Sequence, residues 1–208
     1  MKKTIFSFAV LLAAIGAAEA QTDHATIITS DQVQKVLKSS NSTDKTLQVF
    51  DLGGYQMSVA VVHRGKTAVP AAATPARAPA AAGPRCGLAA APAGAAQAPV
   101  AGMIAHADTV ETYIVISGGG TLVTGGQIVN GTPSAPDAEV TRILNGPSCS
   151  GRAFGDIQSR PMKVGDIAVI PAGLPHGWTA ITDEVTYLSV RPDPKKVLQP
   201  GYVNPAMK

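Results

Sequence analysis

Short apolar runs that alternate with polar residues dominate the pattern of the chain, and they predict β-strands. Residues 46–52 and 55–63 alternate in this way on either side of Gly53 and Gly54, which predicts a first hairpin. In the second half, the same pattern predicts strands at residues 111–117, 121–124, 139–144, 156–162, 167–170, 177–181 and 185–191. The glycines at 118–120 predict another tight hairpin, and residues 146–155 are expected to form a loop.

One segment follows a helical period instead. Residues 30–38 begin with Ser30, a residue type that caps helices well, and place Val33, Val36 and Leu37 on one face. We therefore expect one short amphipathic helix packed on a sheet. Together with roughly nine short strands separated by glycine and proline turns, this predicts an all-β fold closed into a barrel or jelly roll.

Composition narrows the picture without changing it. The 208 residues are 45% hydrophobic and only 4% aromatic, and they include 21 glycines and 16 prolines, which is typical of one turn-rich β domain. The formal charge of +3 is small and scattered, so nucleic-acid binding is not expected. No segment after the first twenty residues is long and apolar enough to predict insertion into a membrane.

The first twenty residues have the pattern of a secretory signal. Lys2 and Lys3 precede an apolar run over residues 5–15, and Ala18-Glu19-Ala20 supplies the small residues of a cleavage site. We expect cleavage near Ala20 and a secreted or periplasmic mature protein. Cys86 and Cys149 would then reach an oxidising compartment, where either a disulfide or two unpaired thiols are consistent with the sequence.

Residues 68–101 differ in composition from the rest of the chain. Of these 34 residues, 17 are alanine and 6 are proline, and none is aromatic or acidic. Alanine favours helix, but proline at this frequency removes hydrogen-bond donors and breaks helical turns. The segment is therefore expected to be a disordered insert between two strands.

Two spaced motifs in the second half carry a family resemblance. Gly165-x5-Pro171-x-Gly173-x2-His176 resembles the second motif of the cupins, G-x5-P-x-G-x2-H-x3-N. Upstream, His106-x4-Glu111-x6-Gly118 resembles the end of the first cupin motif, G-x5-H-x-H-x3–4-E-x6-G.

The resemblance covers about residues 100–192, and more loosely the strands from 46. It implies a cupin-type jelly-roll β-barrel over residues 46–192, interrupted by the insert. Residues 21–45 would form an N-terminal extension with the short helix, and residues 193–208 a C-terminal tail.

The resemblance also implies a metal site. Cupins usually hold a metal with three histidines and a glutamate, and the matching positions here are His106, Glu111 and His176. The chain has Ile104 where the family has the first histidine and Ala180 where the second motif ends in asparagine. Asp108 is a candidate fourth ligand or an ordinary turn residue. Lone His63, before Arg64 and Gly65, is interpreted as a surface residue.

The alternation of the strands supports the same grouping. Glu111 shares a strand face with Tyr113, and His176 shares one with Trp178, so two imidazoles and a carboxylate would converge beside an aromatic wall. Such a set can hold a divalent ion, iron, manganese, nickel or zinc, with open positions for other ligands. Tyr113 and Trp178 are the candidate substrate-binding residues, although ordinary packing explains them equally well.

Three functions follow as expectations. The first is an exported, metal-dependent enzyme that acts on a small organic molecule, such as an oxygenase, isomerase or lyase. The second is a metal-free cupin that binds a sugar or small acid without catalysis, which Ile104 and Ala180 favour. The third is a scaffold whose barrels pair as a homodimer. The fold alone does not choose among them.

Overall fold

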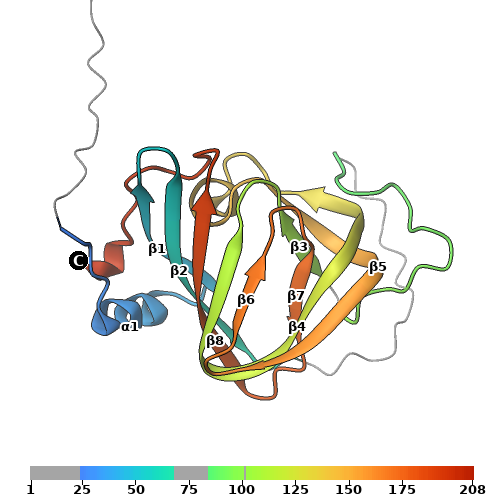
Figure 1. Ribbon diagram of the computed structural model, residues 1–208, viewed down its shortest axis with the longest axis horizontal. Helices are drawn as coiled ribbons and strands as arrows, with labels where there is room; N and C mark the ends of the chain where they lie inside the picture. Colours follow the sequence, from blue (N-terminus) through green and yellow to red (C-terminus); the bar gives the residue numbers. More distant parts are fainter. Residues whose placement is uncertain (1–23, 68–83, 101) are drawn as a thin grey trace, which may run out of the picture.

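The computed structural model describes residues 24–67, 84–100 and 102–208, and β-strands are its main regular elements (Figure 1). The described strands are β1 Asp44–Asp51, β2 Gln56–Gly65, β3 Met103–His106, β4 Glu111–Pro133, β5 Ser148–Lys163, β6 Ile167–Ile170, β7 His176–Thr179 and β8 Glu184–Asp193. The helical elements are α1 Ser30–Ser39, a π-helical turn η1 Val140–Leu144 and a 3-10 turn η2 Pro205–Met207.

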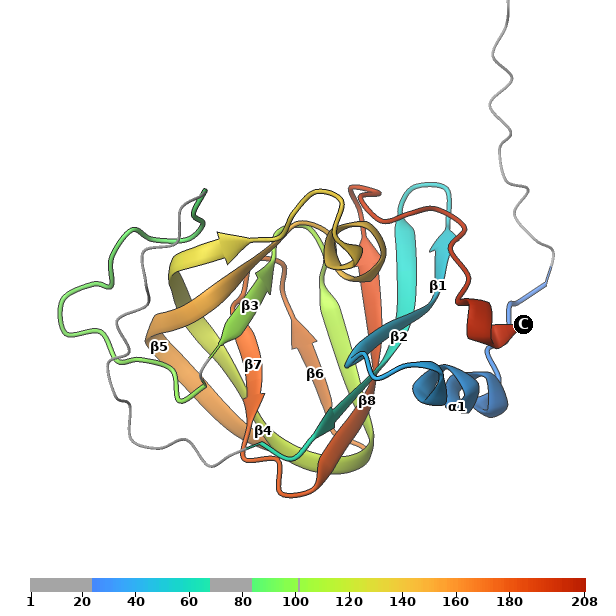
Figure 2. The same cartoon turned by 180° about the vertical axis from the view of Figure 1, so that it is seen from behind.

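The strands close on one another. β1, β2, β8 and β4 are neighbours in that order, and β6 adds to the other side of β4. From β4 the pairing continues through β5 and β3 to β7, and β7 returns to β4, so the second sheet forms a ring. Figure 2 shows the two long strands β4 and β5 wrapping around the shorter β3 and β7. This closed antiparallel barrel confirms the cupin-type fold that the two motifs implied.

The hairpin expected at residues 118–120 is absent from the described fold, because β4 continues through these glycines. Here β4 leaves β8, its partner up to Gly118, and begins to pair with β5 at Gly119. Gly118 has φ 64°, and a Cβ on it would lie 2.0 Å from the carbonyl oxygen of Glu184. The glycines therefore allow β4 to bend where it passes from one sheet to the other. The local sequence pattern of such a bend is the same as that of a tight turn.

The strand expected at residues 139–144 is also wrong, since residues 140–144 form η1. Arg142 N–H donates to the carbonyl of Ala138, and Asn145 N–H to that of Val140, so the backbone bonds are local. A short apolar run has no period long enough to separate strand from helix. The loop expected at residues 146–155 is largely strand, because β5 begins at Ser148.

Buried side chains lie both inside the barrel and outside it. The interior cluster is aromatic and aliphatic and includes Tyr113, Trp178 and Tyr187. Outside, the amphipathic helix α1 packs on β1 and β2 through Val36, as predicted, although its N-cap is Thr29 instead of Ser30. Residues 194–208 return to this side, so that η2 lies beside α1 (Figure 2).

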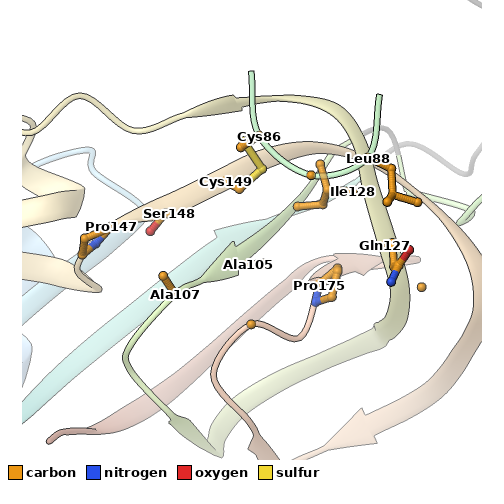
Figure 3. Close-up of a pocket in the computed structure, with 13 residues that line it drawn as sticks. Cys86, Leu88, Ala105, Ala107, Gln127, Ile128, Pro147, Ser148, Cys149 and Pro175 are labelled. Carbon is orange, nitrogen blue, oxygen red and sulfur yellow. A yellow bond between two sulfur atoms is a disulfide. The ribbon is translucent and has the colours of Figure 1, made fainter. Parts of the chain in front are cut away.

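The Ala/Pro-rich segment is only partly within the described residues. Residues 68–83 and 101 lie outside them, as do residues 1–23, which include the expected signal sequence and its expected cleavage site. Residues 84–100 differ from the expected disorder, because Cys86 forms a disulfide with Cys149 (Figure 3) and Leu88 forms a β-bridge with Val129. Ala98 is buried on the outer face of the ring sheet. A covalent link to β5 is a constraint that composition does not reveal.

Membrane insertion was not expected for the mature chain. Every helix in the described ranges is too short or too polar to traverse a lipid bilayer.

We expect the Cys86–Cys149 disulfide to stabilise the fold substantially. It closes a loop with a sequence separation of 63, for which loop-closure entropy gives about 4 kcal/mol. The double variant Cys86→Ser/Cys149→Ser should therefore lose about that much free energy of unfolding in a denaturant titration. Wild type measured with a reducing agent should match it, and a loss below about 1 kcal/mol would contradict the prediction.

Candidate metal centre

The structure brings together the three residues that the motifs singled out. His106 ends β3, Glu111 begins β4 and His176 begins β7. Glu111 Oε2 lies 3.3 Å from His106 Nε2 and 3.0 Å from His176 Nε2. All three side chains are buried, at 4%, 2% and 3% exposure respectively. This His–Glu–His triad is a possible metal site, formed where the ring of strands closes.

The outer nitrogen of each imidazole is fixed by a hydrogen bond. His176 Nδ1 donates to the carbonyl of Leu174, at 3.0 Å. Ser148 donates its hydroxyl proton to the carbonyl of Gly146, so at 2.7 Å its Oγ must accept from His106 Nδ1. In the neutral form, each ring would therefore carry its proton on Nδ1 and direct the Nε2 lone pair at Glu111.

This arrangement fits a divalent cation. Two imidazole lone pairs and a carboxylate oxygen facing one another repel unless a positive charge lies among them. With bonds near 2.1 Å, two ligands of one metal lie about 3.0 Å apart at right angles and about 3.4 Å apart in a tetrahedron. The observed 3.0 Å and 3.3 Å lie in this range. Nδ1–H bonds to a carbonyl and a hydroxyl are the usual outer contacts of metal-binding histidines.

The second oxygen of Glu111 belongs to a polar network that the sequence analysis missed. Glu111 Oε1 accepts hydrogen bonds from Asn145 Nδ2 at 2.9 Å, Ser189 Oγ at 3.1 Å and Arg191 Nε at 2.9 Å. Burial by itself would raise the pKa of Glu111, but the positive charge of Arg191 outweighs it and holds the pKa well below its usual value. Glu111 is therefore a carboxylate with one oxygen committed to structure and one to the triad.

Arg191 is the centre of that network and is fully buried. It also donates to the carbonyl of Leu144 and forms an ion pair with Asp44. Burial acts to lower the pKa of Arg191, but the two carboxylates outweigh it and raise the value. The alternation Val185, Tyr187, Ser189, Arg191 places this arginine on the inward face of β8, which is the signal that could have revealed it.

The candidate substrate-binding residues lie in the barrel interior beside the triad. Tyr113 is buried and donates its hydroxyl proton to Glu111 Oε2 at 2.9 Å. Burial raises the pKa of Tyr113 well above its usual value, so the phenol is a proton donor here. Trp178 stacks with Tyr187 at a centroid distance of 5.4 Å. Their contact with a substrate stays a prediction.

The remaining candidates lie away from the triad. Asp108 pairs with Lys195 on the surface and is not among the grouped ligands. His63 is half exposed and lies at hydrogen-bond distance from the Thr186 hydroxyl. Ala180 has φ 50°, a left-handed conformation that asparagine tolerates better than alanine. The asparagine of the family motif therefore matches a backbone requirement at the end of β7.

Ile104 is placed where a fourth ligand would stand. It shares a face of β3 with His106 and is the register partner of His176 across the strand pair. The missing histidine of the first motif is thus an apolar side chain next to the triad.

Two pockets lie near the triad, but neither is lined by its members. One, of about 430 Å³, lies behind β3 between Ala105, Ala107 and the Cys86–Cys149 disulfide, on the face opposite His106 (Figure 3). The other, of about 440 Å³, includes Ile170 and Leu174. Ile170 is the register partner of Glu111, and the Leu174 carbonyl holds His176. The second pocket therefore ends next to the triad.

Comparison with known proteins gives likenesses of fold. No family model matches the chain, and no curated protein matches it. A solved structure of DMSP lyases is 15% identical with a TM-score of 0.29, and it covers 65% of this chain. The chain spans 37% of that lyase chain.

Two other solved structures share the likeness. KdgF from Halomonas sp. is 10% identical with a TM-score of 0.32, covering 70% of this chain and 86% of its own. The Cnp3 cupin domain of Schizosaccharomyces pombe is 9% identical with a TM-score of 0.34, covering 76% and 66%. The protein has a cupin-type fold, and this conclusion rests on the strand pairing of its own barrel.

The substitution Ile104→His should strengthen metal binding. It places a third imidazole on the face shared by His106 and opposite His176, so we expect the affinity for Zn²⁺ or Co²⁺ to rise at least about tenfold. Competition with a chromophoric chelator measures this change. Ala105→His, which puts the same group on the outer face of β3, is the matched control and should leave affinity unchanged. Equal affinities for both variants would contradict the placement.

Proposed function

We propose that this protein is an exported, metal-dependent cupin-fold enzyme that acts on a small organic molecule, in the manner of an oxygenase, isomerase or lyase. The observation that carries the proposal is the convergence of three lone pairs, from His106 Nε2, His176 Nε2 and Glu111 Oε2, on one buried point. The fixed Nδ1 protons support it, because they leave those lone pairs no hydrogen-bonding role toward each other.

The roles of the chain's own residues follow from their contacts. His106, His176 and Glu111 would hold the ion, and a bound divalent metal supplies a Lewis acid or oxygen-binding centre. Arg191, Asn145 and Ser189 fix the carboxylate through its other oxygen, so its position does not depend on the ion.

The aromatic residues have a separate role. Tyr113 keeps a proton at hydrogen-bond distance from Glu111 and can deliver it to a substrate oxygen placed there. The indole N–H of Trp178 is buried and has no hydrogen-bond partner among the described residues. Such a group is a donor that an acceptor on a ligand would satisfy, which supports its assignment to substrate binding.

A second candidate is a metal-free cupin that binds a sugar or small acid. Ile104 favours it, because the apolar side chain removes one of the usual four ligands. In that case the histidines and Glu111 would be polar groups of the pocket. The pairing of barrels into a homodimer also stays a prediction.

Metal analysis of the purified protein distinguishes these candidates. We expect close to one equivalent of iron, manganese, nickel or zinc per chain after reconstitution. His106→Ala and His176→Ala should lose this metal. Ser148→Ala, which removes only the partner of His106 Nδ1, should weaken affinity by about 10- to 100-fold.

His63→Ala is the matched control, since this histidine lies on the surface away from the triad and should leave metal content unchanged. Glu111→Ala is avoided, because it would leave Arg191 buried without its carboxylate and destabilise the fold. Wild-type protein that takes up no metal would overturn the enzymatic proposal and leave the metal-free candidate.

Export is supported by the signal pattern at the N-terminus and by the disulfide, which persists in oxidising compartments. Expressed in a bacterium from the full sequence, the protein should accumulate outside the cytoplasm with Gln21 as its first residue. N-terminal sequencing checks this. A protein that keeps Met1 and stays in the cytoplasmic fraction would refute export.

A further inference from the structure

The pocket that ends next to the triad contains a charged residue that the triad does not use. Its lining residues come from β4, β5, β6 and the turn before β7: Leu122, Thr124, Gln158, Arg160, Pro161, Met162, Asp166, Ile167, Ala168, Val169, Ile170 and Leu174. Eight of its twelve lining residues are apolar, and its only cationic side chain is that of Arg160. Its volume of about 440 Å³ suits a small organic molecule.

The sheet register places Arg160 on the same face as the triad. Arg160 is the partner of Leu122, and Leu122 is the partner of Trp178, whose side chain is in the interior cluster. In the adjacent row, Gln158 is the partner of Thr124, and Thr124 is the partner of His176. Register partners in antiparallel strands project to one side, so Arg160 and His176 lie on the same face of the strands, with His176 buried and Arg160 exposed.

Strand spacing then gives the scale of the gap. Arg160 lies two strands across from His176 and two residues along, which puts their Cα atoms about 12 Å apart at ~4.8 Å per strand and ~3.4 Å per residue. Both side chains project from the same face of the sheet, so their ends stay separated by a gap on this scale. A molecule of a few carbon atoms that contacts a group at each end spans such a gap.

Arg160 is available for such a molecule. Its side chain is exposed in the pocket, and among the described residues it makes no hydrogen bond or ion pair with the protein. The one carboxylate in the lining, Asp166, accepts a hydrogen bond from the backbone N–H of Lys163 at 2.9 Å. A guanidinium presents parallel N–H donors that match a carboxylate in a two-point contact.

We infer that Arg160 anchors the carboxylate of a small organic acid whose other end reaches the His–Glu–His triad. Gln158 and Thr124 lie between the two ends and supply polar contacts, and Leu122 and Met162 cover the carbon chain. The inference rests on the proposed function for the role of the triad, and it names the substrate class as short carboxylates.

Binding of succinate, a four-carbon dicarboxylate, tests the inference. Titration calorimetry with Co²⁺-loaded and metal-free protein should show binding that Arg160→Gln weakens about tenfold or more, with Arg160→Lys intermediate. Succinamide, which has the same length and no charge, should bind weakly to wild type and equally to Arg160→Gln. Lys163→Gln removes the same charge from β5 at the end of the strand, outside the pocket, and should bind succinate like wild type.

The outcomes separate this inference from the proposed function. If Co²⁺ binds but Arg160→Gln binds succinate as tightly as wild type, the assignment of Arg160 is wrong and the metal site stands. If wild type binds no Co²⁺, the enzymatic proposal fails. The titrations of metal-free protein then decide whether succinate binding depends on Arg160. Wild type that binds no succinate in either form overturns the substrate class. If Lys163→Gln weakened succinate binding as much as Arg160→Gln, the loss would reflect net charge alone. The assignment of Arg160 as the carboxylate anchor would then be wrong.

Discussion

The buried ion pair between Arg191 and Glu111 is the interaction on which the site depends. It joins β8 to β4, and Asp44 extends it to β1, so three strands of one sheet meet at a single guanidinium. A buried charge is tolerated only when it is paired, so the guanidinium and the two carboxylates hold one another in position. Because one oxygen of Glu111 is held in this way, the other is directed at the imidazoles whether or not an ion is present. The geometry of the candidate metal centre is thus set by the core of the barrel.

The π-helical turn η1, which lies outside the sheets, supplies further hydrogen bonds to the Arg191–Glu111 ion pair. Its C-terminal end brings the Leu144 carbonyl to Arg191 and the Asn145 amide to Glu111. Asn145 is buried, and the following strand β5 begins with Ser148, the partner of His106. A short irregular segment therefore positions groups around both a carboxylate and an imidazole of the triad. Its loss of strand pairing is compensated by these hydrogen bonds.

The sequence predicted the parts of this protein that depend on local pattern. The alternating strands, the amphipathic helix and the two spaced motifs led to the barrel and to His106, Glu111 and His176. Features set by contacts across long distances were missed. Gly118 resembled a turn residue because the sheet corner that it serves involves Glu184, far along the chain. Arg191 and Asn145 resembled ordinary polar residues, since nothing near them in sequence shows that Glu111 is their neighbour.

The three triad residues lie on strands that differ in length and in the number of strands that pair with them. Glu111 belongs to the 23-residue strand β4, which is shared by both sheets and paired with β5, β6, β7 and β8. His106 and His176 lie on four-residue strands, and β3 and β7 touch each other through one register pair, Ile104 with His176. Short strands with few pairings open at lower free energy than long ones. Of the three triad residues, Glu111 therefore has the strand with the most pairing partners, which makes the carboxylate the fixed reference point of the site.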